Sequence, residues 1–407
     1  MKPSLNVFLA LTLCVVGCAK APEFVKEDLK SPSMSGSGEP DLIFGDDGKL
    51  YHTWIAPHTD LGSALTYAAF DNGSWGQSHI ISTGEDWFVN WADFPTMAIA
   101  ANGEMVSHWL QKSGPDTYAY DVRLSHSMGG HEWSPPITPH NDGTQTEHGF
   151  VSLLPLDEGR FSVTWLDGRE TGGGHGHDDG HGGGGPMTLR TATWGPDGIT
   201  NDTLLDPMVC DCCPTDAVRL NDKLVVVYRD RSEDEVRDIM MVTGSGDHWS
   251  EPQKIHDDNW TIAGCPVNGP AVDAQDGVLA FAWFTQGPDG EEAQVYITHS
   301  QDGGRQFGKA FRVDNGRPVG RVDIAYLRDG KGLVSWLELV EDGNQELRVR
   351  LFGTGGLIGD SFTVGVMREG RSTGMPRMAV YKGDAYLTWT DPHQEQTVQL
   401  AKVSVTF

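Results

Sequence analysis

Residues 94–109 read FPTMAIAANGEMVSHW: an apolar segment, a polar turn with glycine, and a second apolar segment that ends in tryptophan. Apolar segments bounded by turn residues are typical of short antiparallel strands. The pattern occurs seven times along the chain, and each copy closes on an aromatic residue. These residues are Trp54, Trp109, Trp165, Tyr228, Trp283, Trp336 and Trp389.

The closing aromatics recur every 53 to 63 residues, and the one long interval contains a glycine- and histidine-rich insert at 171–185. Each copy continues with two more strand-like segments, as at 118–124 and 136–138. Four short strands per repeat are typical of a β-propeller, whose blades stack radially because a single blade cannot bury both its faces. We therefore predict an all-β propeller of seven four-stranded blades over residues 39–407, with six blades as the alternative.

The last copy is one strand short, since only residues 397–407 remain after its closing Trp389 and loop. The strand-like segment at 23–29 can supply the missing outer strand. A ring closed by strands from both termini has no open edge. The serine- and glycine-containing residues 30–38 would then connect this strand to the first blade.

The N-terminus has the pattern of an export signal. Met1-Lys2 precedes an apolar run at 7–16 that is too short to span a bilayer. The following Val15-Val16-Gly17-Cys18 resembles a bacterial lipobox, which implies removal of residues 1–17 and a lipid on Cys18; ordinary cleavage is the alternative. In that pattern Ala19 implies outer-membrane sorting. We expect residues 18–38 to tether the propeller to the outer membrane, on its periplasmic or cell-surface side.

Charge restricts the partners. The formal net charge is −27, which repels nucleic acid and anionic headgroups, so we exclude a DNA or RNA partner. The same charge is also explained by solubility alone. The expected partner is a small molecule, a glycan or a metal ion, and the membrane is contacted through the lipid anchor only.

One turn carries a family resemblance. Residues 300–307, Ser-Gln-Asp-Gly-Gly-Arg-Gln-Phe, resemble the Asp-box of the sialidase-like propellers, and degenerate forms occur at 127–133 and 245–249. In that family the Asp-box is a folding element on the face opposite the active site. The resemblance implies three arginines that hold a substrate carboxylate, a Tyr–Glu nucleophile pair and an Asp acid/base. The first copy reads Glu39-Pro40-Asp41 where the family has Arg-Ile-Pro.

Unusual residues gather in the loops that should share one face of the propeller, the mouth of the central channel. As catalytic candidates, the sequence offers Asp93 and Glu147 for acid/base work and Arg321, Arg371 and Arg377 for an anionic group. The candidates for ligand binding are Trp91, His148, Asp216, Arg229, Asn268 and Asp323.

Four further cysteines, Cys210, Cys212, Cys213 and Cys265, leave two readings open. The leading interpretation is two structural disulfides. Cys212-Cys213 and Cys265 occupy equivalent repeat positions in neighbouring blades, so a bridge from either to Cys265 is expected, and Cys210 could form a second bridge with the remaining cysteine. Adjacent residues of an extended chain point in opposite directions, so only one of the two can face Cys265. The alternative is a soft-metal site, because thiolates favour copper(I) or zinc.

The insert adds His175, His177 and His181, which are either metal ligands or part of a solvated loop. No cofactor is certain from the sequence, and copper or zinc are the candidates. The leading hypothesis is a sialidase-like lipoprotein that binds a ligand or metal at the mouth without the family's glycosidase chemistry. The alternatives are an exo-sialidase or related glycoside hydrolase acting on exported glycans, and a non-catalytic interaction module.

Overall fold

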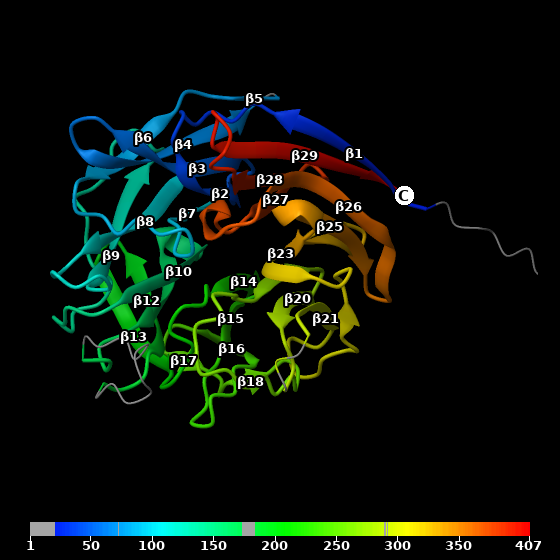
Figure 1. Cartoon of the computed structure of the whole chain (residues 1–407). Coiled ribbons are helices and arrows are strands. Elements are labelled where there is room, and N and C mark those ends of the chain that lie inside the picture. The colour runs from blue at the N-terminus through cyan, green and yellow to red at the C-terminus, as the bar shows by residue number, and fades with distance from the viewer. Residues whose placement is uncertain (1–20, 72, 173–183, 289, 291) are drawn as a thin grey trace, which may run out of the picture.

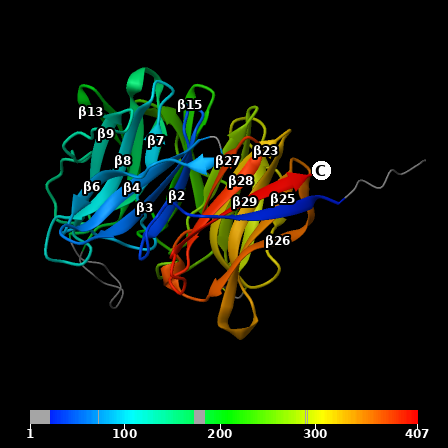
Figure 2. The ribbon, with the colours of Figure 1, turned by 90° about the horizontal axis from the view of Figure 1, so that it is seen from above.

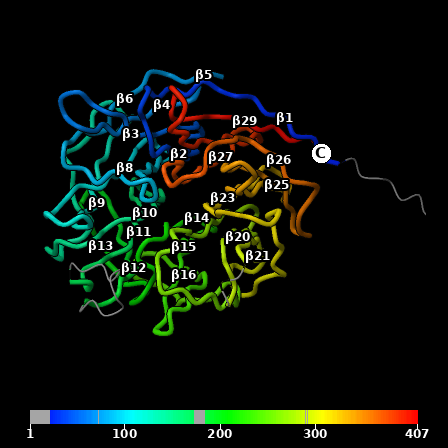
Figure 3. The backbone as a smooth tube through the Cα atoms, in the orientation of Figure 1, coloured from blue at the N-terminus to red at the C-terminus, as the bar shows by residue number. Residues whose placement is uncertain are grey.

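The computed structural model describes residues 21–407 except 72, 173–183, 289 and 291. Seven antiparallel sheets form a ring around a central channel (Figure 1). The fold is therefore a seven-bladed all-β propeller, as predicted, and the six-bladed alternative is wrong. The Cα trace runs once around the ring from the N-terminal to the C-terminal blade (Figure 3).

The first three sheets follow in chain order. The first contains β2 (Gly38–Phe44), β3 (Leu50–His58), β4 (Gly62–Asp71), β5 (Ser74–Trp75) and β6 (His79–Gly84). The second contains β7 (Met97–Ile99), β8 (Glu104–Lys112) and β9 (Tyr120–Met128), and a bridge from Leu124 to Ile137 stands in place of a fourth strand. The third contains β10 (His148–Pro155), β11 (Phe161–Asp167), β12 (Thr188–Gly195) and β13 (Gly198–Asp206).

The next three sheets repeat the arrangement. The fourth contains β14 (Asp216–Leu220), β15 (Lys223–Arg229), β16 (Ile239–Ser245), β17 (His248–Trp249) and β18 (Gln253–Lys254). The fifth contains β19 (Ala271–Gln275), β20 (Val278–Thr285), β21 (Gln294–Ser300) and β22 (Phe311–Arg312). The sixth contains β23 (Pro318–Arg328), β24 (Lys331–Leu339), β25 (Asn344–Gly353) and β26 (Gly356–Arg368). The described helical residues form three short 3-10 turns, η1 (Asp157–Gly159), η2 (Glu341–Gly343) and η3 (Arg371–Thr373).

The seventh sheet combines strands from the two ends of the chain. It contains β27 (Arg377–Tyr381), β28 (Asp384–Thr390), β29 (Val398–Thr406) and, outermost, β1 (Glu23–Leu29). β1 pairs antiparallel with β29 from Glu23 opposite Thr406 to Leu29 opposite Leu400. The two strands lie side by side in both views (Figures 1 and 2).

The closing aromatics lie on the second strand of each sheet and are all buried, with 5% or less of their surface exposed. Each larger hydrophobic cluster joins two neighbouring blades. Val106 of β8 packs in one cluster with Val163 of β11, and Leu347 of β25 packs in another with Leu387 of β28. The repeated tryptophan is therefore a core residue between blades, and burial of apolar surface holds the ring together.

Aspartates on the innermost strands link one blade to the next. The carboxylates of Asp216, Asp273 and Asp323 accept the backbone N–H groups of Val272, Tyr326 and Met378, each on the following blade. These inner strands line a channel of about 670 Å³. These three hydrogen bonds form a belt along the channel that joins the fourth, fifth, sixth and seventh blades.

The turn at residues 300–307 behaves as a folding element. Asp302 Oδ1 accepts the backbone N–H groups of Arg305 and Gln306 at 3.0 and 2.9 Å, and Ser300 Oγ accepts that of Gly304 at 2.8 Å. Gly303 and Gly304 both have φ near +80°, a conformation that costs other residues steric energy. The turn connects β21 to β22, away from the mouth loops.

None of the helical segments described here has the length and apolar character needed to cross a membrane.

Candidate functional site

A cavity of about 320 Å³ opens among the mouth loops of the second to fifth blades and the seventh. Aromatic side chains form much of its wall, together with the three acids Asp93, Glu147 and Asp211, with Arg371 and with the Cys212–Cys265 bridge. The aromatic residues that line it are Phe88, Trp91, Tyr118, Tyr120 and Phe150. Of the catalytic and ligand-binding candidates, Trp91, Asp93, Glu147 and Arg371 line this cavity.

Tyr120, Glu147 and Asp93 form a buried hydrogen-bonded group in the cavity wall. The Tyr120 hydroxyl donates to Glu147 Oε1 at 2.5 Å and lies 3.5 Å from Asp93 Oδ2. All three residues are 5% exposed or less. Asp93 lies in the β6–β7 loop, Tyr120 is the first residue of β9, and Glu147 immediately precedes β10.

Backbone geometry fixes Asp93 against the third blade. Its Oδ1 accepts the N–H of Phe150 at 2.8 Å, and Phe150 has φ of +54° at a bulge in β10. A Cβ added at Gly149 would lie 2.0 Å from Asp93 Oδ2, so only glycine fits there. The same arrangement recurs at Asn268, whose Oδ1 accepts the N–H of Arg321 at 2.7 Å.

Burial makes both acids weak. It raises the pKa of Asp93 to about 7, although hydrogen bonds from Phe150 and Tyr120 act in the opposite direction. It raises the pKa of Glu147 to about 8, opposed by the hydrogen bond from Tyr120 and supported by the charge of Asp93. Two carboxyl groups that hold protons near neutral pH beside one phenol are suited to acid/base chemistry.

The three arginine candidates do not converge in one cavity. Arg321 is buried behind Trp91, with its guanidinium carbon 4.5 Å from the ring centre, and it donates to Thr373 Oγ1 and the Gly374 carbonyl. Arg377 lies in the channel, 3.1 Å from Asp41 and 3.5 Å from Asp323. Only Arg371 lines the mouth cavity, and in the described part of the chain its guanidinium has no carboxylate within 4 Å.

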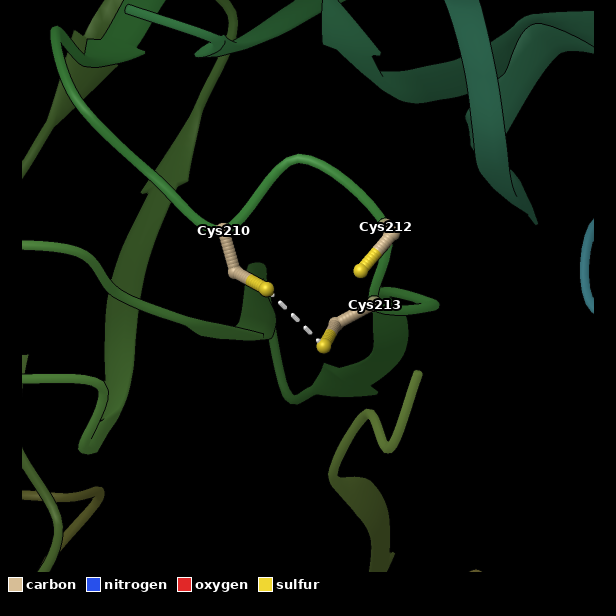
Figure 4. Close-up of side chains that lie close together, drawn as sticks. All are labelled: Cys210, Cys212 and Cys213. Carbon is tan, nitrogen blue, oxygen red and sulfur yellow. Dashed lines mark hydrogen bonds between the residues drawn. The ribbon is translucent and has the colours of Figure 1, made fainter. Parts of the chain in front are cut away.

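The predicted bridge to Cys265 is present, but the second predicted disulfide, between Cys210 and the remaining cysteine, is not. Cys212 and Cys265, on loops of neighbouring blades, form a disulfide with Cα atoms 6.0 Å apart. The Cys213 side chain points toward Cys210, and the two sulfurs lie 3.0 Å apart without a bond between them (Figure 4). The Arg237 guanidinium is 3.3 Å from the Cys210 sulfur. Burial would raise the pKa of Cys210, but the hydrogen bond with Cys213 and the charge of Arg237 together lower it.

Four residues expected to bind ligand are placed in the framework instead. Arg229 is 1% exposed, and its guanidinium donates to the carbonyls of Asn268, Arg237 and Phe284 at 2.6 to 2.8 Å. Asn268 holds the backbone of the next blade, and Asp216 and Asp323 belong to the belt of hydrogen bonds along the channel. Their polar atoms are used between blades, which the sequence pattern does not reveal.

His148 also lies outside the cavity. It is fully buried behind Glu147, and its ring stacks on that of His140 with the centroids 3.7 Å apart. Four candidates, Cys18, His175, His177 and His181, fall outside the described residues.

Sequence reasoning missed the aromatic residues Tyr118 and Tyr120. Both stand at the end of the loop that leads from the second to the third strand of the second blade, and that loop belongs to the mouth face. The strand register that assigns the other loops to the mouth face also assigns to it the loop that carries these tyrosines.

No protein-family model and no curated protein matches the sequence. Solved structures match the fold. The BP39L lectin from Burkholderia pseudomallei is 11% identical, with 91% of this chain and 96% of that chain covered and a TM-score of 0.55. The polysaccharide lyase Uly1 is 9% identical over 91% of this chain and 90% of that chain, with a TM-score of 0.53.

Sialidases and other glycoside hydrolases are also among the similar structures. The NanB sialidase from Streptococcus pneumoniae is 10% identical over 95% of each chain, with a TM-score of 0.48. At these identities the similarity concerns the fold. The chain has the fold of a seven-bladed β-propeller.

Proposed function

We propose that this protein binds a carbohydrate in the mouth cavity and hydrolyses its glycosidic bond. The observation that carries the proposal is the Tyr120–Glu147–Asp93 group, in which two carboxyl groups of raised pKa contact one phenol inside an aromatic-lined cavity. The aromatic wall would stack on the apolar face of a sugar ring. One protonated carboxyl group would donate its proton to the leaving oxygen.

The Tyr120 hydroxyl is oriented for a second role. It donates to Glu147 Oε1, so the carboxylate form of Glu147 can accept the phenol proton while the oxygen attacks the anomeric carbon. Asp93 would then serve as the acid. Of the three arginines, only Arg371 lines the cavity. The geometry therefore favours a glycoside hydrolase with a broader substrate class over an exo-sialidase.

The test is hydrolysis of a panel of fluorogenic aryl glycosides, including a sialoside, by the purified protein. Glu147→Gln and Asp93→Asn should each lower kcat by at least about 100-fold, in the range of general acid/base catalysis. The matched control is Asp206→Asn, because Asp206 accepts a hydrogen bond from Tyr228 at 2.6 Å outside the cavity. Equal activity in all three variants would refute the proposal.

A second function, carbohydrate binding without cleavage, is favoured by the packing of Tyr120. Its ring is 1% exposed and stacks under Phe88 with the centroids 4.1 Å apart. In that case Trp91→Ala should abolish glycan binding in a glycan array or by calorimetry, while no glycoside is turned over and Glu147→Gln binds as the wild type does.

We also propose that the propeller is exported and lipid-anchored. The lipobox-like residues 15–18 support this, and the Cys212–Cys265 disulfide suits an oxidising compartment. Cys18→Ala should move the protein from the membrane fraction to the soluble fraction. Membrane association that survives this change would count against a lipid anchor at this residue.

A further inference from the structure

A second polar cluster lies on the opposite face of the backbone segments that carry Tyr120 and Glu147. Tyr120 and Glu147 face the mouth cavity, and the residues that follow them, Asp121 and His148, face the other way because side chains alternate along a strand. His140, from the loop before β10, completes the cluster. We call Asp121, His140 and His148 the histidine cluster.

The two imidazole rings are held parallel between two carboxylates. Their centroids are 3.7 Å apart and their planes differ by 5°. At one edge, Asp142 Oδ2 lies 3.1 Å from His140 Nδ1 and 3.3 Å from His148 Nε2. At the other edge, Asp121 Oδ1 lies 3.9 Å from both His140 Nε2 and His148 Nδ1.

The Asp121 edge contains buried polar atoms without hydrogen bonds. His140 Nε2 and Asp121 Oδ1 have no partner in the described structure, and the His140 side chain is 4% exposed. His148 Nδ1, the third atom of this edge, lies 3.2 Å from the Thr146 carbonyl oxygen and would release that contact to bind an ion. Buried polar atoms are rarely left unpaired. A separation of 3.9 Å is too long for a hydrogen bond, but two ligands each about 2.1 Å from one ion stand roughly 3.4 to 4.2 Å apart.

The other edge already has its cation. Arg169 donates to both oxygens of Asp167 at 2.7 Å, and one of its nitrogens lies 3.6 Å from Asp142 Oδ2. Of the three carboxylates around His148, Arg169 contacts those of Asp142 and Asp167, and no contact with Asp121 is found among the described residues. Within 4 Å of the Asp121 carboxylate, the described residues offer the two histidines and no Arg or Lys.

The chain offers an internal comparison. His256-Asp257-Asp258 repeats the His-x-Asp sequence of residues 140–142, and His256 Nδ1 pairs with Asp258 Oδ1 at 2.8 Å. Asp258 also accepts the indole N–H of Trp283, as Asp167 accepts that of Trp165. A lone His-x-Asp pair is thus a framework feature. The second histidine and Asp121 distinguish the cluster between the second and third blades.

We propose that Asp121, His140 and His148 bind one divalent transition-metal ion of the zinc class. Two imidazole nitrogens and one carboxylate oxygen suit zinc, whereas calcium and magnesium prefer oxygen ligands alone. Asp142 holds the opposite nitrogen of His140, as outer partners of metal-bound histidines do. The ion fastens β9 to the start of β10, directly behind Tyr120 and Glu147.

The test is titration of the full-length protein with Zn²⁺ alone, after chelation and removal of the chelator. We expect one tight equivalent by calorimetry, and His140→Ala and Asp121→Asn should each weaken it by at least about tenfold. Asp121 is partly exposed, so the Asp121→Asn variant should fold even if His140→Ala does not. His256→Ala is the matched control and should bind as the wild type does.

Two other parts of the chain carry zinc-competent side chains, so the test must separate them. One equivalent of Zn²⁺ should still bind tightly to the Cys210→Ser/Cys213→Ser variant. The same holds for the variant in which His175, His177 and His181 are all changed to alanine. Co²⁺ bound at the cluster should show no sulfur charge-transfer absorption. Absence of tight binding in the wild type, or a loss confined to the cysteine or insert variants, would overturn the proposal.

Discussion

At the residue scale, the charge state of Asp93 has a consequence for stability that does not depend on any substrate. Its pKa lies near 3.8 in a solvated chain and near 7 in the folded protein. As pH rises between these values, the unfolded chain loses the proton first. The folded state therefore becomes less stable by up to about 4 kcal/mol over this interval, since one pKa unit corresponds to about 1.4 kcal/mol.

Asp93→Asn removes this titration and keeps an oxygen that can accept from Phe150. We expect the variant to gain stability relative to the wild type at pH 8, and to gain less or nothing at pH 4. Urea unfolding at the two pH values measures the difference. An equal effect at both pH values would show that the pKa of Asp93 is the same in the folded and the unfolded protein.

Arg229 illustrates a buried charge used for structure. Its three hydrogen bonds reach carbonyls of the mouth loop of its own blade and of the next blade. Arg229→Leu would leave these carbonyls unpaired, and we expect a loss of at least about 3 kcal/mol of unfolding free energy. Arg219→Leu, which removes an exposed ion pair with Asp157, should cost less than about 1 kcal/mol. Similar losses in chemical denaturation would contradict the framework role.

At the scale of elements, β1 covers the outer edge of the seventh sheet. Its seven residues pair with β29, and the ring of Phe24 stacks on that of Phe362 of the neighbouring blade, 5.2 Å between centroids. Without β1, the edge of β29 would expose unpaired backbone groups, which favours aggregation.

A chain that starts at residue 30 should therefore melt at a lower temperature and form oligomers in size-exclusion chromatography. The matched control is a chain that starts at Pro22 and keeps β1; it should remain as stable as the longer protein. Equal melting temperatures would show that the strand contributes nothing to the ring.

At the scale of the whole molecule, the Cys212–Cys265 disulfide links the fourth and fifth blades across 53 residues of sequence. Closing a loop of this length restricts the unfolded chain, with an expected stabilisation of about 4 kcal/mol in the entropic model. Cys212→Ser/Cys265→Ser should lower the unfolding free energy by an amount of this order. A loss below about 1 kcal/mol would mean that the interfaces between blades already provide this restraint.

The sequence by itself determined the repeat, the strand class and the blade count, because these depend on alternation and spacing along the chain. It also determined that one of Cys212 and Cys213 must face Cys265, since adjacent side chains of an extended segment point apart. Trp91, Asp93, Glu147 and Arg371 were placed at the mouth because strand register assigns each loop to a face.

Only the tertiary structure decided which polar residues remain available for a ligand. Arg229, Arg377 and Asn268 carry the same groups as residues of a binding site, yet they form hydrogen bonds and ion pairs between blades. The pairing of Tyr120 with Glu147 likewise depends on how closely the second blade packs against the third. Such contacts join residues far apart in sequence, and their distances are set by the packing of the ring, which no local pattern encodes.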